Sequence, residues 1–175
     1  MARCGNCKEP TTNRYGLTAA CNPEHAIAIA RAKQAKKDAK QLREDKARIK
    51  TRQQWLKEAQ AAFNAWIRER DHNEPCISCN RFHTGSYDAG HYRNVGSNPA
   101  LRFEPLNCWK QCVPCNQHRS GNSIEYRIHL VRRIGVERVE WLEGPHEPKK
   151  YDIPELHAIK AKYTKMRREL EKERL

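Results

Sequence analysis

The chain has 175 residues, and its 34 Lys and Arg residues outnumber 21 Asp and Glu residues to give a formal net charge of +13. Such a charge predicts a polyanionic partner, most often nucleic acid, with a ribosome-like basic protein as the alternative. The sequence has no run of 18 apolar residues, and its start, MARCGNCKEP, lacks the apolar segment of a signal peptide. We therefore expect no membrane span and a cytoplasmic protein.

The first 25 residues are predicted to form a small zinc module. A C-x2-C pair is followed, thirteen residues later, by a C-x3-H pair. Three cysteines and one histidine can close a structural zinc site. The predicted ligands are Cys4, Cys7, Cys21 and His25. The histidine is the least specific of the four, because a histidine near a helix start is often a surface residue.

Residues 26–70 are predicted to form a long basic helical arm. Asn22 suits the N-cap and Pro23 the first helical position, and no Gly or Pro occurs in residues 24–70. This segment carries about half of the excess positive charge, so we expect it to contact DNA phosphates. The lysines expected to do so are Lys33, Lys36, Lys37 and Lys40.

Apolar residues in the same segment give two further indications. Near the end of this segment, the apolar residues follow helical spacing and are expected to pack on a core. These residues are Trp55, Leu56, Ala59, Phe63, Trp66 and Ile67. A faint heptad, which permits a homodimer, consists of Leu42, Ile49, Leu56 and Phe63.

Residues 71–135 are predicted to form the core domain, and residues 136–175 a linker with a C-terminal helix. The core begins with polar turns and two strand-like pieces, SYDAGHYR and ALRF. A helix is expected at SIEYRIHLVRRIG, ended by Gly135. Its predicted apolar face consists of Ile124, Ile128, Leu130, Val131 and Ile134. The last helix follows a Pro- and Gly-rich link, and Asp152 with Glu155 resembles a capping box at its start.

Two C-x2-C pairs, separated by 32 residues, predict a second zinc site in this core. The predicted ligands are Cys76, Cys79, Cys112 and Cys115. The spacing suits a tetrahedral ion better than a disulfide framework, which indicates a reducing compartment. Four thiolates leave no open coordination position, so this zinc is expected to be structural.

Polar residues inside this zinc clip favour hydrolytic chemistry. Asp88 and His91 lie between the cysteine pairs, and Asn116 and His118 follow the second pair. Because the clip joins its two halves, we expect these four side chains to face one cleft. Histidine is a base near neutral pH, and carboxylate and amide oxygens are suitable ligands for Mg²⁺. Each residue also has a purely structural interpretation, as a turn cap or a surface residue.

The pattern PCISC…DAGHYR…LRF…N…QCVPCNQHRSGN resembles the HNH, or ββα-metal, nuclease superfamily. More specifically, it resembles the NinG (Rap) recombination proteins of lambdoid phages, and the likeness covers about three quarters of the chain. It implies an α+β fold: a small zinc-stapled HNH-like core, long flanking helices and an N-terminal zinc module. It also implies a structure-specific endonuclease that cuts Holliday junctions and D-loops.

The resemblance implies roles for particular residues. His91 corresponds to the general base, and Asn107 to the asparagine that orients this histidine or its loop. Asn116 corresponds to a ligand of the catalytic Mg²⁺ or Mn²⁺, with Asp88 and His118 as candidates to complete that site. Around the cleft, the expected phosphate contacts are Arg93, Arg102, Lys110 and Arg119.

The sequence departs from the superfamily pattern at the residue directly before His91. Many members have an aspartate immediately before this histidine, whereas this chain has Gly90. The nearest aspartate, Asp88, is therefore a weaker match to the second metal ligand.

Three functions remain open at this point. The first is the endonuclease. The second is a non-catalytic zinc-ribbon module that binds nucleic acid, and the third is an accessory protein that binds phage or host recombination proteins through the long helix. The expected partners are branched DNA and a second copy of the chain, in the nucleoid of a phage-infected or prophage-carrying bacterium.

Overall fold

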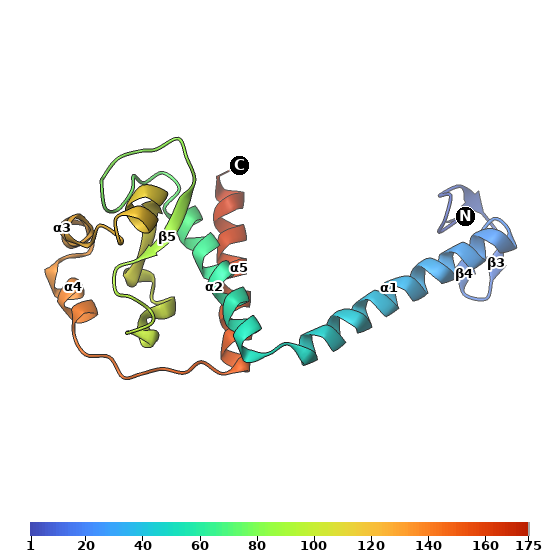
Figure 1. Ribbon diagram of the computed structural model, residues 1–175. Helices are drawn as coiled ribbons and strands as arrows, with labels where there is room; N and C mark the ends of the chain where they lie inside the picture. The colour runs from blue at the N-terminus through green and yellow to red at the C-terminus, as the bar shows by residue number, and fades with distance from the viewer. Residues whose placement is uncertain (175) are drawn as a thin grey trace. The chain divides into compact units, whose positions relative to one another are not determined.

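The computed structural model describes residues 1–174 and shows helices together with small antiparallel sheets (Figure 1). The mixed α+β class is thereby confirmed. The chain divides into two compact units, Met1–Lys50 and Thr51–Leu175. Among the described residues, no helix is both long enough and apolar enough to cross a membrane.

The first unit has two short hairpins and one long helix. Strand β1 (Ala2–Arg3) pairs with β2 (Pro10–Thr11), and β3 (Arg14–Tyr15) pairs with β4 (Thr18–Ala19). Helix α1 (Pro23–Ile49) starts as predicted, because the Asn22 side chain accepts a hydrogen bond from the His25 backbone N–H at 2.8 Å. No residue of α1 is buried. This agrees with its sequence, which has too few large apolar side chains to form a face that packs on a core.

The predicted arm of residues 26–70 consists of two helices, so its boundary differs from the expected one. Helix α1 ends at Ile49, and α2 (Arg52–Arg70) begins after Thr51. Thr51 and Gln54 form a capping box in which each side chain bonds the other's backbone N–H. Helix α2 belongs to the second unit. The faint heptad crosses this break, so its residues do not share one helix.

The second unit is built around α2, a two-stranded hairpin and the C-terminal helix α5 (Ile153–Glu173). Helices α2 and α5 lie side by side (Figure 1). Five of the six apolar residues predicted for the core face of α2 are buried: Trp55, Ala59, Phe63, Trp66 and Ile67. Helix α5 begins with the predicted capping box of Asp152 and Glu155.

The hairpin pairs β5 (Tyr87–His91) with β6 (Cys108–Cys112) in antiparallel register. Sequence analysis expected no strand at β6, and the expected strand ALRF is a 3-10 helix. The remaining elements are the 3-10 helices η1 (Pro99–Phe103) and η2 (Pro105–Asn107), the π-helical turn η3 (Pro114–His118), and helices α3 (Ser123–Ile134) and α4 (Val136–Glu143). Helix α4 occupies part of the region predicted as a linker.

Helix α3 has the predicted bounds, but its buried face differs. Gly135 ends the helix with a φ of +87°, a conformation that suits glycine. Tyr126 and Leu130 are buried, whereas Ile124 is 76% exposed and Ile128 is 43% exposed. The aromatic ring of Tyr126 therefore fills the core position that the pattern assigned to isoleucines.

Candidate metal and active site

The four cysteines of the second unit form a site that could hold zinc. Their Sγ atoms all lie within 4.8 Å of one another, and those of Cys79 and Cys112 are 3.9 Å apart. Tetrahedral zinc with Zn–S bonds of about 2.3 Å places two sulfurs about 3.8 Å apart, so the spacing fits. Burial alone would raise the pKa of the Cys76 thiol. Hydrogen bonds from nearby backbone N–H groups, above all from that of Cys79, lower this pKa overall. The thiolate is the form that binds metal.

The predicted N-terminal set also comes together. The Sγ atoms of Cys7 and Cys21 are 3.5 Å apart, and the Cys4 Sγ lies 3.6 Å from the His25 Nδ1. All four ligand atoms lie within 4.8 Å of one another. The backbone N–H of Cys7 is the main cause that lowers the pKa of Cys4 to about 5. These residues could hold a second zinc ion, and His25 lies where the sequence placed it.

A carboxylate–amide cluster lies beside the zinc clip. Asp88 Oδ2 accepts hydrogen bonds from Asn116 Nδ2 at 2.8 Å and from Gln117 Nε2 at 2.9 Å. Since Asn116 directly follows Cys115, the clip itself brings η3 against β5. The sequence predicts Asp88 beside Asn116, whereas Gln117 was not among the predicted site residues although it directly follows Asn116.

His118 does not join this cluster. Its side chain is exposed. Within residues 1–174 it makes no hydrogen bond to Asp88 or Asn116. Gln117 takes the position that the sequence had offered to this histidine.

The surroundings of His91 favour its neutral imidazole form, because the ring is largely buried. Its Nε2–H donates to the backbone oxygen of Arg102 at 3.0 Å. A carbonyl oxygen only accepts, so the proton sits on Nε2 and the lone pair on Nδ1. The ring stacks on Phe63, with centroids 6.1 Å apart. Burial lowers the pKa of His91 below its ordinary value of 6.5. The hydrogen bond to the Arg102 carbonyl opposes this shift, and the charge of Arg102 adds to it.

Asp88 and His91 lie on opposite faces of β5, so the structure does not bring these two side chains together as the sequence led us to expect. Side chains alternate along a strand, and residues three apart point to opposite sides. Helix α2 covers the His91 face through Phe63, whereas η3 covers the Asp88 face through Asn116. Along the strand the two residues are about 10 Å apart at roughly 3.3 Å per residue.

Asn107 connects the end of β5 to η1. Its Nδ2 donates to the backbone oxygens of Arg93 and Leu101, each at 3.1 Å, and its Oδ1 accepts from the Arg93 N–H at 2.8 Å. The side chain is fully buried. Because η1 also carries the carbonyl of Arg102, Asn107 fixes the segment that orients the His91 ring.

The glycine before His91 has a steric reason. A Cβ atom at Gly90 would lie 2.0 Å from the Oε1 of Gln111. The Nε2 of Gln111 donates to Ser78 Oγ at 2.5 Å and to the Gly121 oxygen at 2.6 Å, so its side chain is fixed across Gly90. Position 90 thus has no room for the aspartate of the superfamily pattern. Asp88 is the next acidic residue on the same face.

The predicted phosphate contacts fall into two groups. Lys110 is only 6% exposed, its Nζ donates to the His72 oxygen at 2.8 Å, and it lies 4.4 Å from the centroid of the Tyr87 ring. It is therefore a structural cation, and the predicted phosphate contact is corrected. Arg102 is half-buried, and its Nη1 donates to Gln60 Oε1 at 3.2 Å. The exposed or half-buried candidates are Arg93, Arg102, Arg119, Lys33, Lys36, Lys37 and Lys40.

Comparison with known proteins identifies relatives over nearly the whole chain. Residues 1–173 match the family model described as Bacteriophage Lambda NinG protein. The chain is 44% identical over 192 residues to Protein ninG of Escherichia phage lambda, which covers 98% of this chain and 94% of that protein. It is 42% identical over 188 residues to Protein ninG of Salmonella phage P22, with coverages of 96% and 93%. No solved structure matches the chain.

Proposed function

The chain belongs to the NinG family of bacteriophage proteins, and from this premise we propose that it is a metal-dependent, structure-specific DNA endonuclease with an HNH-like core. Its proposed substrates are branched recombination intermediates such as Holliday junctions and D-loops. One observation carries the proposal: a zinc-clipped hairpin holds both a neutral, desolvated histidine and a carboxylate–amide cluster. The net charge of +13 supports DNA as the partner.

In this proposal His91 is the general base. Its Nε2–H is fixed on the Arg102 carbonyl, so Nδ1 takes the proton from the attacking water. The lowered pKa keeps the ring neutral, and therefore able to accept a proton, at pH 7. Asn107 acts as a positioning residue, because it fixes the η1 segment that holds the ring.

The other face of β5 offers an all-oxygen donor set for a divalent cation. The amide nitrogens of Asn116 and Gln117 face Asp88, so each amide would turn its oxygen toward a bound cation. A carboxylate and two amide oxygens are ligands of the type that Mg²⁺ and Mn²⁺ take. The cation would supply positive charge where the phosphate and the leaving oxygen become more negative. Two coordinated cuts across a junction require two such sites, so we propose that a homodimer acts.

The placement of Asp88 and His91 on opposite faces favours a second candidate function. His91 stacks on Phe63, and Asp88 already accepts hydrogen bonds from two amides. Such a hairpin also suits a non-catalytic zinc-ribbon module. In that case both residues stabilise the hairpin, and the protein binds branched DNA without cutting it.

Cleavage and binding measured on one set of variants separate the two candidates. We expect Asp88→Asn and His91→Ala each to lower the rate of junction cutting at least about 100-fold, the effect typical of a lost acid–base group, while junction binding is retained. His118→Ala serves as the control, and its cutting should match that of the unmodified chain. If the two residues serve one reaction, the double variant should cut no more slowly than the slower single variant. Full cutting by both single variants would refute these assignments.

A further inference from the structure

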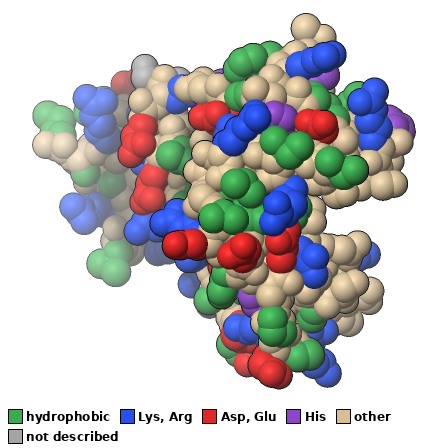
Figure 2. All heavy atoms as spheres, turned by 90° about the vertical axis from the view of Figure 1, so that its left-hand side faces the viewer, with side chains coloured by type: hydrophobic (Ala, Val, Ile, Leu, Met, Phe, Trp, Pro, Cys, Tyr) green, Lys and Arg blue, Asp and Glu red, His purple; other side chains and the backbone are tan. Residues whose placement is uncertain are grey.

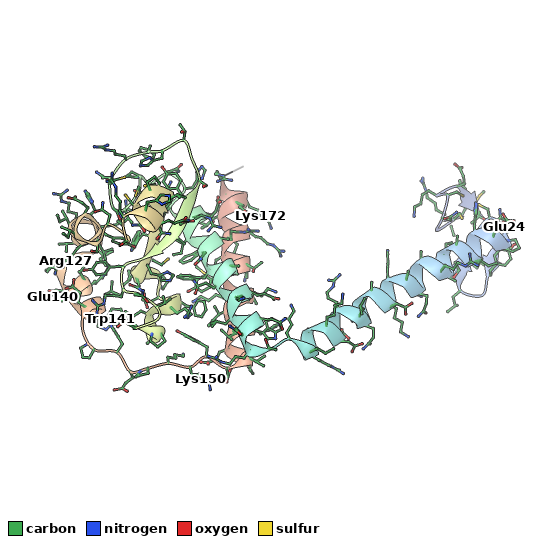
Figure 3. All side chains as sticks on the ribbon, viewed as in Figure 1. Glu24, Arg127, Glu140, Trp141, Lys150 and Lys172 are labelled. Atoms are coloured by element: carbon green, nitrogen blue, oxygen red, sulfur yellow. The ribbon has the colours of Figure 1, made fainter. Side chains whose placement is uncertain are left out.

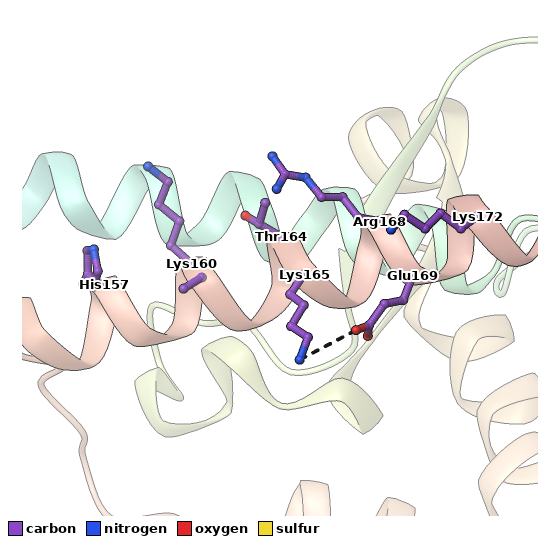
Figure 4. Close-up of a pocket in the computed structure, with 8 residues that line it drawn as sticks. His157, Lys160, Thr164, Lys165, Arg168, Glu169 and Lys172 are labelled. Atoms are coloured by element: carbon purple, nitrogen blue, oxygen red, sulfur yellow. Dashed lines mark ion pairs between the residues drawn. The ribbon is translucent and has the colours of Figure 1, made fainter. Parts of the chain in front are cut away.

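A basic groove runs along α5, and none of its described lining residues belongs to the β5–β6 hairpin. It is a hollow of about 500 Å³ whose described lining residues all lie on this helix, at helical spacing (Figure 4). The core-facing residues of α5, Leu156 and Tyr163, are buried on a different side of the helix. The groove residues are His157, Lys160, Ala161, Thr164, Lys165, Arg168, Glu169 and Lys172.

The charges of this groove are strongly unequal. Four of the lining residues are Lys or Arg, and Glu169 is the single acidic one. Lys160 is committed to the protein, because its Nζ lies 2.8 Å from Glu58 Oε2. Lys165 makes only an exposed pair with Glu169 at 3.8 Å, a kind of pair that contributes little.

Arg168 and Lys172 are the cations most open to a ligand. Both are exposed, and neither forms an ion pair within the described residues 1–174. Lys172 projects outward from α5 (Figure 3). By contrast, the face that carries α3 and α4 mixes acidic and basic side chains (Figure 2).

We propose that this α5 groove binds the phosphate backbone of a duplex arm of DNA, at a place separate from the site of cutting. Lys165 and Lys172 are seven positions apart, so the cations open to a ligand extend over about 10 Å of helix at 1.5 Å per residue. A duplex presents one phosphate per strand for about every 3.4 Å of its axis. About three phosphates of one strand therefore lie along these cations. A rigid row of cations on one helix suits such a regular backbone.

The inference deepens the proposed function and rests on it, because a branched substrate has duplex arms that extend beyond the cut. A second contact on such an arm would position the branch without reading its sequence. The binding is expected to depend on salt and to be independent of base sequence.

The test measures binding of a short labelled duplex and of a four-way junction by fluorescence anisotropy, over a series of salt concentrations and without added Mg²⁺ or Mn²⁺. The variant is Arg168→Gln with Lys172→Gln. Two lost phosphate contacts should lower the salt slope by about two and weaken binding roughly 30-fold at 0.15 M salt. Glu169→Gln should instead tighten binding several-fold, a gain that misfolding would not produce.

The matched control removes two exposed cations elsewhere in the same unit, with Arg138→Gln and Lys150→Gln. Its binding should be much closer to that of the unmodified chain. The inference would be overturned if the groove and control variants lost DNA affinity equally, or if the groove variant bound DNA as tightly as the unmodified chain. The groove would then bind another partner, such as an acidic protein. Junction binding in this assay, together with no cutting once Mg²⁺ or Mn²⁺ is added, would refute the proposed nuclease while leaving the groove supported. No DNA binding at all would refute both.

Discussion

The contact between Gly90 and Gln111 allows a quantitative test of the hairpin. Replacing Gly90 with alanine adds one methyl group whose carbon would lie 2.0 Å from Gln111 Oε1. The backbone of Gly90 lies in β5 and has no positive φ, so alanine meets no conformational penalty there. The effect of the substitution is therefore that of the contact alone.

The expected cost follows from the fixed position of the Gln111 side chain. Overpacking by a methyl group costs about 1–3 kcal/mol when the neighbour cannot move. Gln111 can move only by giving up its bonds to Ser78 and Gly121, each worth about 0.5–1.5 kcal/mol. We therefore expect Gly90→Ala to lower the free energy of unfolding by about 2 kcal/mol. Gly85→Ala, where a Cβ would meet no atom within 4 Å, should change it by less than about 0.5 kcal/mol.

Urea unfolding followed by tryptophan fluorescence measures this effect in the right unit. All four tryptophans lie in the second unit: Trp55, Trp66, Trp109 and Trp141. Free zinc must be buffered at one concentration for all variants, because a metal that binds only the folded form raises apparent stability. The shift of the midpoint at constant slope then gives the change in stability.

A double-mutant cycle with Gln111→Ala provides the refutation. Once Gln111 is shortened to alanine, the 2.0 Å contact with Oε1 is gone and only the contact with its Cβ at 3.0 Å remains. Alanine at position 90 should then cost clearly less, so the two changes should be coupled by about 1–3 kcal/mol. Additive effects, or a Gly90→Ala protein as stable as the unmodified chain, would show that the close approach does not constrain this position.

Three further predictions concern the base, the zinc clip and the arm. The rate of cutting should be constant at pH 7–8 and fall as the pH drops through the lowered pKa of His91, because only the neutral ring accepts a proton; a fall that begins above pH 7 would contradict this. Cys79→Ala should leave the second unit without a cooperative urea transition, since the zinc site contributes folding free energy; a cooperatively unfolding variant would show that the clip is dispensable. Neutralising the lysines of α1 should weaken binding to every DNA sequence alike and lower the salt slope by up to about four, and an unchanged slope would remove the arm from the DNA interface. The lysines to be replaced are Lys33, Lys36, Lys37 and Lys40.

The zinc ligands and the helix starts could be predicted because their signals are local. The C-x2-C spacings fix which cysteines can share one ion, and the structure places all eight predicted ligands in two sets. The Asn22 cap and the Asp152 capping box were equally local. The break between α1 and α2 was also predictable from the sequence, because Thr51 and Gln54 have the spacing of a capping box.

Other features depend on which elements pack together. Nothing in the local pattern shows that Lys110 is enclosed by His72 and Tyr87, or that Tyr126 and not Ile124 faces the core. The opposite orientation of Asp88 and His91 was predictable, however. Once YDAGH is taken as a strand, residues three apart must point to opposite faces.

The most direct test of the account is cutting of a labelled four-way junction by the zinc-loaded protein, with Mg²⁺ or Mn²⁺ added. The account predicts paired cuts near the branch point that depend on the added cation, and the loss of these cuts in His91→Ala although the junction is still bound. A junction that is bound by the unmodified chain but stays intact with either cation would contradict the central claim.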